Sequence, residues 1–184
     1  MNNRMIKQVF IINGNGGVGK DAFIEMLNNL FWKECIIGNY SSVDKVKEIA
    51  KAVGWDGSKT ERNRKFLNDL KMLTIAFNDM PLNDIKKYTN NFMSNGNTNR
   101  ILFLHVREPE EIAKAVSEFK EYNAKVILIK RDSVKHIVSN MADGNVYDYD
   151  YDIVINNNET LIELRNKAEC FYKDLLNDSL KKEY

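Results

Sequence analysis

The apolar positions of this 184-residue chain fall into two kinds of pattern that alternate along its length. Short apolar runs rich in β-branched residues predict buried strands at residues 9–13, 35–40, 101–106, 125–129 and 153–155. Apolar residues that recur every three or four positions predict helices at residues 21–31, 43–53, 60–77, 83–93 and 161–175. Pro109 marks the start of one more helix, because proline fits the first helical position and the glutamates around it complement the positive helix end.

Strands that alternate with helices predict an α/β fold, a parallel sheet covered by helices on both faces, and the length fits a single domain, residues 1–184. The net charge of +1 provides no overall field, so we expect neither nucleic acid nor a membrane as a partner. Cys35 and Cys170 are too few for a disulfide framework, and the chain shows no membrane-length apolar run and no signal-peptide pattern. These features indicate a cytoplasmic protein.

A glycine-rich turn joins the first strand to the first helix. It reads Gly14-Asn15-Gly16-Gly17-Val18-Gly19-Lys20-Asp21 and fits the pattern G-x-x-x-x-G-K between a strand and a helix. Glycines let successive backbone N–H groups surround phosphate oxygens, and the helix adds its positive end. A simple turn requires neither four glycines at these positions nor a lysine. The turn therefore predicts a nucleoside triphosphate site with ATP as co-substrate, formed by Asn15, Gly16, Gly17, Val18, Gly19, Lys20 and Asp21.

Asp21 stands where such loops usually carry Ser or Thr, whose hydroxyl binds Mg²⁺. A carboxylate is also a suitable oxygen ligand for Mg²⁺, directly or through water. Without a cation it would repel phosphate, so metal and nucleotide should bind together. The alternative is that Asp21 only caps the helix, and both interpretations stay open at this point.

The remaining chain favours a small kinase over other classes that use this loop, because it has no N-K-x-D guanine motif and lacks the length of an ATPase motor. Residues 41–99 form a mostly helical insert for the acceptor, and residues 131–150 form a short polar lid. Five segments carry a resemblance: G-K-D at 19–21, S-S-V-D-K-V-K-E at 41–48, K-T-E-R-N-R-K-F-L at 59–67, H-V-R-E-P-E-E at 105–111 and Y-D-I-V-I-N-N at 151–157. In this order they resemble the phage-type deoxynucleoside monophosphate kinases and the related P-loop phosphomevalonate kinases. The resemblance implies a three-layer P-loop sandwich with a five-stranded parallel sheet.

The same resemblance implies that Arg107, after the third strand, holds the acceptor's phosphate, which a guanidinium can bind through two parallel hydrogen bonds. A salt bridge to a nearby glutamate is the alternative. Arg64, in the insert, is either a second ligand of that phosphate or a solvated surface charge. We expect Arg107 and Arg64 to converge on one anionic pocket that faces the phosphate loop.

Three further residues are candidates for acceptor or phosphoryl binding. Asp44 either orients the acceptor or serves as N-cap of a helix that starts at Lys45. Lys47, one turn into that helix, aids acceptor binding. Arg131 opens the lid and would clamp the transferring phosphate, unless it forms a salt bridge at the edge of the sheet.

Two features depart from the family or stay ambiguous. His105 stands where the family has an aspartate that supports the metal's water shell, and a neutral imidazole is a poor magnesium ligand. It is either a sign of weakened catalysis or a buried histidine with a hydrogen-bonding partner. Tyr147, Tyr149 and Tyr151 alternate as in a strand, which predicts packing rather than chemistry.

The leading hypothesis is Mg²⁺- and ATP-dependent phosphoryl transfer to a small phosphorylated acceptor, with Lys20, Arg107 and Arg131 as catalytic residues and Asp21 as metal ligand. A (deoxy)nucleoside monophosphate leads among acceptors, and phosphomevalonate-like and dephosphocoenzyme A-like molecules come after it. The alternative of another class is a nucleotide-responsive binding protein with a degenerate kinase centre. The sequence is compatible with a monomer or a homodimer.

Overall fold

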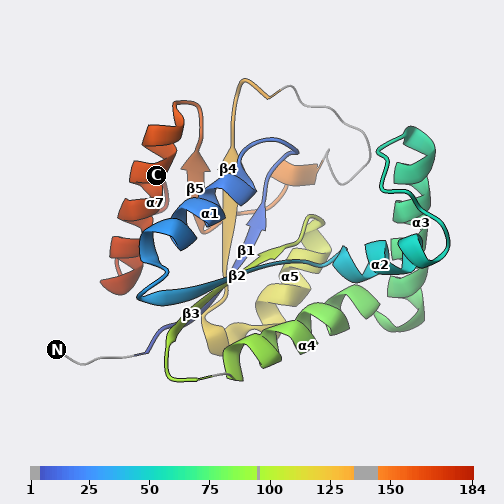
Figure 1. The fold of residues 1–184 in the computed structure, drawn as a ribbon, viewed down its shortest axis with the longest axis horizontal. Helices are drawn as coiled ribbons and strands as arrows, with labels where there is room; N and C mark the ends of the chain where they lie inside the picture. Colours follow the sequence, from blue (N-terminus) through green and yellow to red (C-terminus); the bar gives the residue numbers. More distant parts are fainter. Residues whose placement is uncertain (1–4, 95, 135–144) are drawn as a thin grey trace.

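The protein folds around one parallel five-stranded sheet with the strand order β2-β3-β1-β4-β5 (Figure 1). A computed structural model describes residues 5–94, 96–134 and 145–184. The strands are β1 (Lys7–Asn13), β2 (Cys35–Ser41), β3 (Asn99–His105), β4 (Lys125–Lys130) and β5 (Ile153–Asn156). Each strand pairs in parallel with its neighbours, so the predicted α/β class with a five-stranded parallel sheet is confirmed.

Helices cover both faces of the sheet. The helices are α1 (Lys20–Phe31), α2 (Asp44–Ala52), α3 (Glu61–Asn78), α4 (Met80–Ser94), α5 (Pro109–Glu118) and α7 (Leu161–Leu176), with short 3₁₀ turns at Lys120–Tyr122 and Asn145–Tyr147. Helices α1 and α7 lie on one face, α4 and α5 lie on the other, and α2 with α3 extends beyond the β2 side of the sheet (Figure 1). No helix in the described part of the chain is long and apolar enough to cross a membrane.

The central strand β1 is apolar on both faces because both are covered. Phe10 and Ile12 belong to the core beneath α1 and α7, while Val9 and Ile11 belong to the core beneath α4 and α5. The Phe10 ring lies 5.2 Å from the Phe171 ring of α7, measured between centroids. Burial on both sides fixes β1 in place, and the glycine-rich turn leaves from its carboxyl end.

The register brings the carboxyl ends of three strands to one edge. Ile12 of β1 and Ser41 of β2 both lie opposite His105 of β3. Sites in sheets of this kind lie beyond that edge, so the predicted motifs share one region of space.

The tyrosine-rich segment before β5 differs from the sequence prediction. Tyr147, Tyr149 and Tyr151 do not alternate along a strand, because Asn145–Tyr147 is a 3₁₀ turn and β5 begins only at Ile153. The Asp152 carboxylate accepts the Val126 N–H at 2.7 Å, which occupies a donor at the start of β4. Tyr151 is buried as expected for packing, whereas Tyr147 is 48% exposed.

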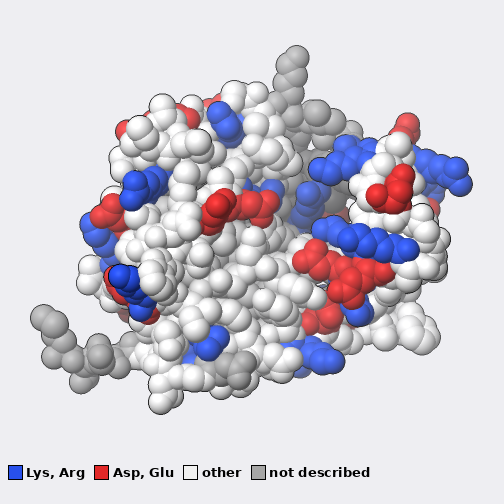
Figure 2. Space-filling model, viewed as in Figure 1, with Lys and Arg blue, Asp and Glu red and all other residues white. Residues whose placement is uncertain are grey.

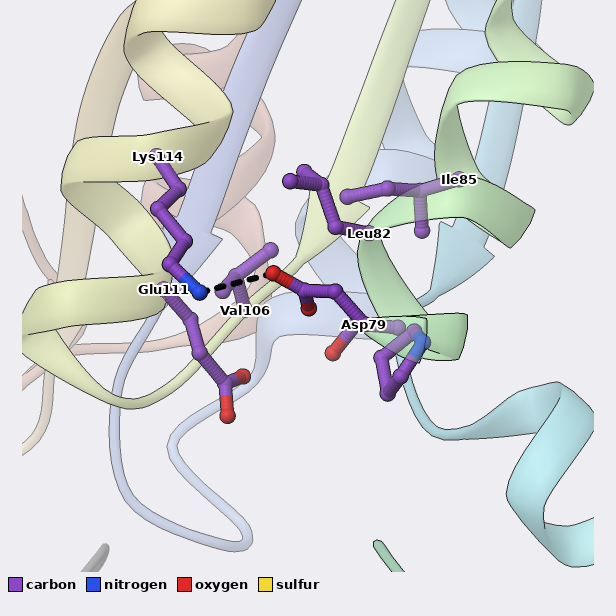
Figure 3. A pocket seen from close by; sticks show the side chains of 8 residues that line it. Asp79, Leu82, Ile85, Val106, Glu111 and Lys114 are labelled. Atoms are coloured by element: carbon purple, nitrogen blue, oxygen red, sulfur yellow. Dashed lines mark hydrogen bonds and ion pairs between the residues drawn. The ribbon is translucent and has the colours of Figure 1, made fainter. Parts of the chain in front are cut away.

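The segment 41–99 contains α2, α3 and α4, and three ion pairs connect α3, α4 and the turn between them to α5. They are Lys71–Glu111 at 2.6 Å, Asp79–Lys114 at 2.7 Å and Lys86–Glu118 at 2.6 Å. Figure 3 shows the Asp79–Lys114 pair beside Leu82, Ile85 and Val106, around a cavity of about 10 Å³. That volume suits about one water molecule, so this cavity is not a substrate site. Within the predicted lid at 131–150, residues 135–144 lie outside the described residues.

The junction between β1 and the glycine-rich turn is sterically demanding at Gly14. Its φ of +139° disfavours other residues, and an added Cβ would lie 2.3 Å from the Ile129 carbonyl oxygen of β4. We expect Gly14→Ala to lower the free energy of unfolding by about 2–4 kcal/mol, measured by urea denaturation. Gly16→Ala is the matched control, because a Cβ at Gly16 meets no atom within 4 Å. Equal stability of the two variants would contradict this account of the junction.

Candidate nucleotide and acceptor cleft

A cleft of about 610 Å³ lies at the carboxyl edge of the sheet, between the glycine-rich turn and the α2–α3 unit. Its walls come from the turn, the ends of β2 and β3, and helices α2 and α3. Figure 2 shows Lys and Arg side chains around the hollow between the main body and α2–α3. The charged lining residues are Lys20, Asp21, Asp44, Lys47, Lys59, Arg64, Lys71, Arg107 and Glu108.

The glycine-rich turn has the form of a phosphate-binding loop. Gly17 and Gly19 have φ values of +83° and +99°, and Gly19 is the N-cap of α1. The Lys20 ammonium donates to the Gly14 carbonyl at 2.6 Å and to the Asn15 carbonyl at 2.9 Å. Of the seven predicted nucleotide residues, Gly16, Gly17, Lys20 and Asp21 line the cleft. Asn15 and Val18 are buried, so they lie within the loop rather than on its open side.

Two buried asparagines that the sequence reasoning did not single out hold this loop. The Asn13 carboxamide oxygen accepts the Gly14 N–H at 2.8 Å, and its nitrogen donates to the Arg107 carbonyl at 3.1 Å and the Tyr151 hydroxyl at 2.8 Å. Asn157, after β5, donates to the Val18 carbonyl at 2.8 Å. An added Cβ on Gly19 would lie 2.4 Å from the Asn157 nitrogen, so this close approach requires glycine.

Asp21 lies at the mouth of the loop with its side chain 84% exposed. Gly19, and not Asp21, occupies the N-cap of α1, so of the two interpretations left open for Asp21 the helix cap is wrong. Its Oδ1 accepts a hydrogen bond from the Asn39 amide at 3.2 Å. In the described part of the chain no three His, Cys, Asp or Glu side chains are grouped to hold a metal. A cation at Asp21 would therefore complete its shell with phosphate oxygens and water, which suits Mg²⁺.

His105, at the end of β3, is partly enclosed, with 17% of its side chain exposed. Its Nε2 lies 2.7 Å from the Asn39 carboxamide oxygen. Burial lowers the pKa of His105 to about 4; the negative charges of Asp21 and Asp44 act in the opposite direction, and the positive charges of Lys20 and Arg107 act in the same direction as burial. The imidazole is therefore neutral at pH 7. Its surroundings fit the second interpretation given above, a histidine with a hydrogen-bonding partner.

The predicted acceptor residues all line the same cleft: Asp44, Lys47, Arg64 and Arg107. The Asp44 carboxylate accepts the Ser41 N–H at 3.0 Å and pairs with Lys47 at 3.0 Å. The prediction that Asp44 caps a helix starting at Lys45 is wrong, because α2 begins at Asp44 itself and Val43 is the N-cap.

Other charged residues are placed differently. Lys59 and Lys71 also line the cleft, and Lys71 pairs with Glu111. Lys59 opens the segment 59–67 that carries the resemblance, although no role was predicted for it. Lys71 had no such signal, because exposed lysines occur throughout the insert. Arg131 comes directly after β4, is exposed and is not among the described residues that line the cleft.

The neutral state of His105 predicts a pH dependence of stability. The unfolded chain gains a proton on this histidine near pH 6.5, whereas the folded protein does so only near pH 4. The free energy of unfolding should therefore fall as the pH drops from about 6.5 to 4, by up to about 3 kcal/mol from this group. Urea denaturation with chelator at pH 7 and pH 4.5 should show a smaller fall in His105→Asn than in the parent. Parallel losses in the two proteins would contradict the assignment.

Comparison with known proteins supports the fold. No family model matches the sequence, and no curated protein matches it. Among solved structures it is similar to the Mycobacterium tuberculosis APS kinase in complex with AMPPNP and APS, at 11% identity and a TM-score of 0.51 over 94% of this chain and 99% of that one. It is similar to a putative kinase from Chloroflexus aurantiacus, at 11% identity and a TM-score of 0.51 over 93% of this chain and 98% of that one.

A sugar kinase from Janibacter is similar to the same extent, at 10% identity and a TM-score of 0.51 over 95% of this chain and 99% of that one. Identities this low support the fold and not the substrate. The sheet order, the helices on both faces and the glycine-rich loop after β1 thus give this chain the three-layer fold of the P-loop kinases.

Proposed function

We propose that the protein transfers the γ-phosphoryl group of ATP to a small phosphorylated acceptor. The observation that carries the proposal is the single cleft that joins the phosphate loop, with Gly16, Gly17 and Lys20, to the acceptor candidates Arg64 and Arg107. Phosphoryl transfer depends on positioning and charge neutralisation more than on a strong base. One cleft with a triphosphate loop at one wall and arginines at another meets that requirement.

The loop side of the cleft supports the triphosphate half of the proposal. The Lys20 ammonium donates to two loop carbonyls, and a bound triphosphate would attract it away from them with stronger, charge-assisted hydrogen bonds. The similar APS kinase is in complex with AMPPNP, an ATP analogue, which favours ATP as the donor. Mg²⁺ bound with the nucleotide, through Asp21, would neutralise part of the phosphate charge.

The charge of the cleft supports an anionic acceptor. Six cationic side chains and three carboxylates are among its lining residues, although the whole chain has a net charge of only +1. Lys47 and Lys71 are paired with carboxylates. Among the described residues neither Lys59 nor Arg64 forms an ion pair, so both can bind an acceptor's phosphate. We place a (deoxy)nucleoside monophosphate first, in line with the phage-type family, and a phosphomevalonate-like acceptor second.

The residues of the chain then have distinct roles. Lys20 would stabilise the charge that develops on the transferring phosphoryl group, while Arg107 and Arg64 would orient the acceptor's phosphate for in-line attack. The insert at 41–99 would exclude water from the acceptor side, and the lid at 131–150, with Arg131, would do so on the ATP side.

Cys35 and Cys170 are free thiols, in keeping with a reducing, cytoplasmic setting.

A second function, a nucleotide-responsive binding protein with a degenerate kinase centre, is favoured by one observation. His105 is a neutral imidazole at the position where the resembled kinases carry a carboxylate. An assay of ADP release over a panel of monophosphates separates the two functions. Turnover with any acceptor supports the kinase, and tight ATP binding without turnover supports the binding protein.

Lys20→Ala tests the triphosphate site. We expect affinity for AMPPNP with Mg²⁺ to fall at least 100-fold, because a lysine–phosphate contact of about 3 kcal/mol is lost, measured by calorimetry. The unfolding curve should stay close to that of the parent, since Lys20 is only partly buried and lies at the start of α1, where it donates to the Gly14 and Asn15 carbonyls. Lys33→Ala, an exposed lysine after α1, is the control. Unchanged AMPPNP affinity in Lys20→Ala would contradict the assignment of the glycine-rich turn as a triphosphate site.

Arg107→Ala tests the acceptor site. We expect the acceptor's KM to rise and kcat to fall, with kcat/KM reduced roughly 30-fold for a lost charge-assisted interaction of about 2 kcal/mol. ATP affinity should stay within about twofold, because Arg107 is assigned to the acceptor. Arg165→Ala, at an exposed position on α7, is the matched control. A loss of ATP affinity with no change in the acceptor's KM would contradict this assignment and indicate that Arg107 binds ATP instead.

A further inference from the structure

Three polar side chains from three different elements form a row along the lining of the cleft. They are Asp21 in the first turn of α1, Asn39 in β2 and His105 at the end of β3. The His105 Nε2 lies 2.7 Å from the Asn39 Oδ1, and the Asn39 Nδ2 donates to the Asp21 Oδ1 at 3.2 Å. The His105 Nε2 also lies 3.7 Å from the Asp21 Oδ1, which is beyond hydrogen-bond distance. Asn39 therefore provides the hydrogen-bonded connection between the two residues that depart from the pattern of the resembled kinases.

The register explains why these side chains meet. Ser41 lies opposite His105 in the β2–β3 pairing, and Asn39 lies two residues before Ser41. Side chains two residues apart on a strand point to the same face, so Asn39 and His105 lie on one face of the sheet. Phe103, also opposite Asn39, belongs to the core beneath α1 and α7, which identifies that face as the α1 side.

Only one orientation of the Asn39 carboxamide satisfies both neighbours. An ionised aspartate accepts hydrogen bonds and cannot donate, so the amide nitrogen must face Asp21 and the amide oxygen must face His105. His105 can donate from Nε2 to that oxygen whether the imidazole is neutral or charged. The reversed carboxamide would place two oxygen acceptors against each other at Asp21. The row is therefore directional, from His105 through Asn39 to Asp21.

This direction has a consequence for Asp21. One carboxylate oxygen is held by Asn39, whereas in the described part of the chain Oδ2 has no hydrogen-bond partner. The side chain is 84% exposed and borders the cleft together with Gly16, Gly17 and Lys20. Next to triphosphate oxygens, a free carboxylate oxygen repels unless a cation lies between them.

We propose that Asn39 is a positioning residue, which His105 orients and which holds the Asp21 carboxylate so that its open oxygen binds a divalent cation carried by the nucleoside triphosphate. The proposal rests on the triphosphate site of the proposed function and on no step of catalysis. Holding one oxygen removes rotational freedom that Asp21 would otherwise lose on binding the cation, and partners of metal ligands commonly change metal affinity 10- to 100-fold.

The test is the effect of metal on nucleotide affinity. Calorimetry gives the Kd of AMPPNP with Mg²⁺ and with chelator, and the ratio of the two is the metal effect. In Asn39→Ala we expect this ratio to fall roughly tenfold while the Kd in chelator changes less than about twofold. In an Asp21→Asn background, which has already lost the carboxylate, Asn39→Ala should change the ratio no further. Asn28→Ala, at an exposed position on α1, should leave the ratio at the parent value.

Two outcomes overturn the proposal. One is an unchanged ratio in Asn39→Ala, and the other is an equal fall in the parent and Asp21→Asn backgrounds. Asn39→Leu, which keeps the branched shape and removes both hydrogen bonds, provides the same comparison if Asn39→Ala unfolds. No acceptor or turnover enters these measurements. Failure of the triphosphate site would appear separately, as unchanged AMPPNP affinity in Lys20→Ala.

Discussion

The hydrogen bonds of one buried side chain, Asn13, fix the geometry on which the cleft depends. Its carboxamide binds the first amide of the phosphate loop, the carbonyl of Arg107 and the hydroxyl of Tyr151. These groups belong to the turn after β1, the segment just after β3 and the segment just before β5. A buried amide is costly unless it is fully bonded, so the three segments are held in one arrangement. The backbone of Arg107 is thus fixed relative to the loop through the side chain of another strand.

Charge is the second constraint. The cleft gathers cations in a protein that is close to neutral overall, and it keeps carboxylates in defined places among them. Asp44 is bonded to a backbone amide and to Lys47, while Asp21 accepts a hydrogen bond from the neutral amide of Asn39. The two carboxylates therefore differ: Asp44 neutralises the charge of Lys47, whereas Asp21 keeps one oxygen available for a ligand. This difference is why Asp21, and not Asp44, is the candidate for a cation.

Repeated and rigid patterns could be predicted from the sequence. Apolar runs predict all five strands of the described sheet, most clearly β1, β3 and β4, because a strand covered on both faces must be apolar throughout. The glycines of the turn after β1 could be predicted to matter for a steric reason, since Gly14, Gly17 and Gly19 have positive φ values. Asn13 and Asn39 could not be predicted, because single polar residues in a strand have no period and their partners are distant in sequence. Asn157 belongs to the segment 151–157 that carries the resemblance, but nothing in that segment predicted its hydrogen bond to Val18. The alternating tyrosines before β5 suggested a strand wrongly, since Asn145–Tyr147 is a 3₁₀ turn and the Tyr151 hydroxyl bonds to Asn13 and to the Val146 carbonyl.

Helix α3 is joined to α5 over its C-terminal half, by Lys71–Glu111 and, just beyond its end, Asp79–Lys114. Arg64 lies 15 residues before Asp79, roughly 22 Å along the axis at about 1.5 Å per residue. The nearer of the two ion pairs, at Lys71, lies only seven residues from Arg64, roughly 10 Å along the axis. The two ion pairs thus anchor the C-terminal half of α3, and the two turns before Lys71 carry Arg64 to the cleft. A bend of about 10° in those two turns would carry Arg64 through about 2 Å, so the width of the cleft at this wall depends on their stiffness.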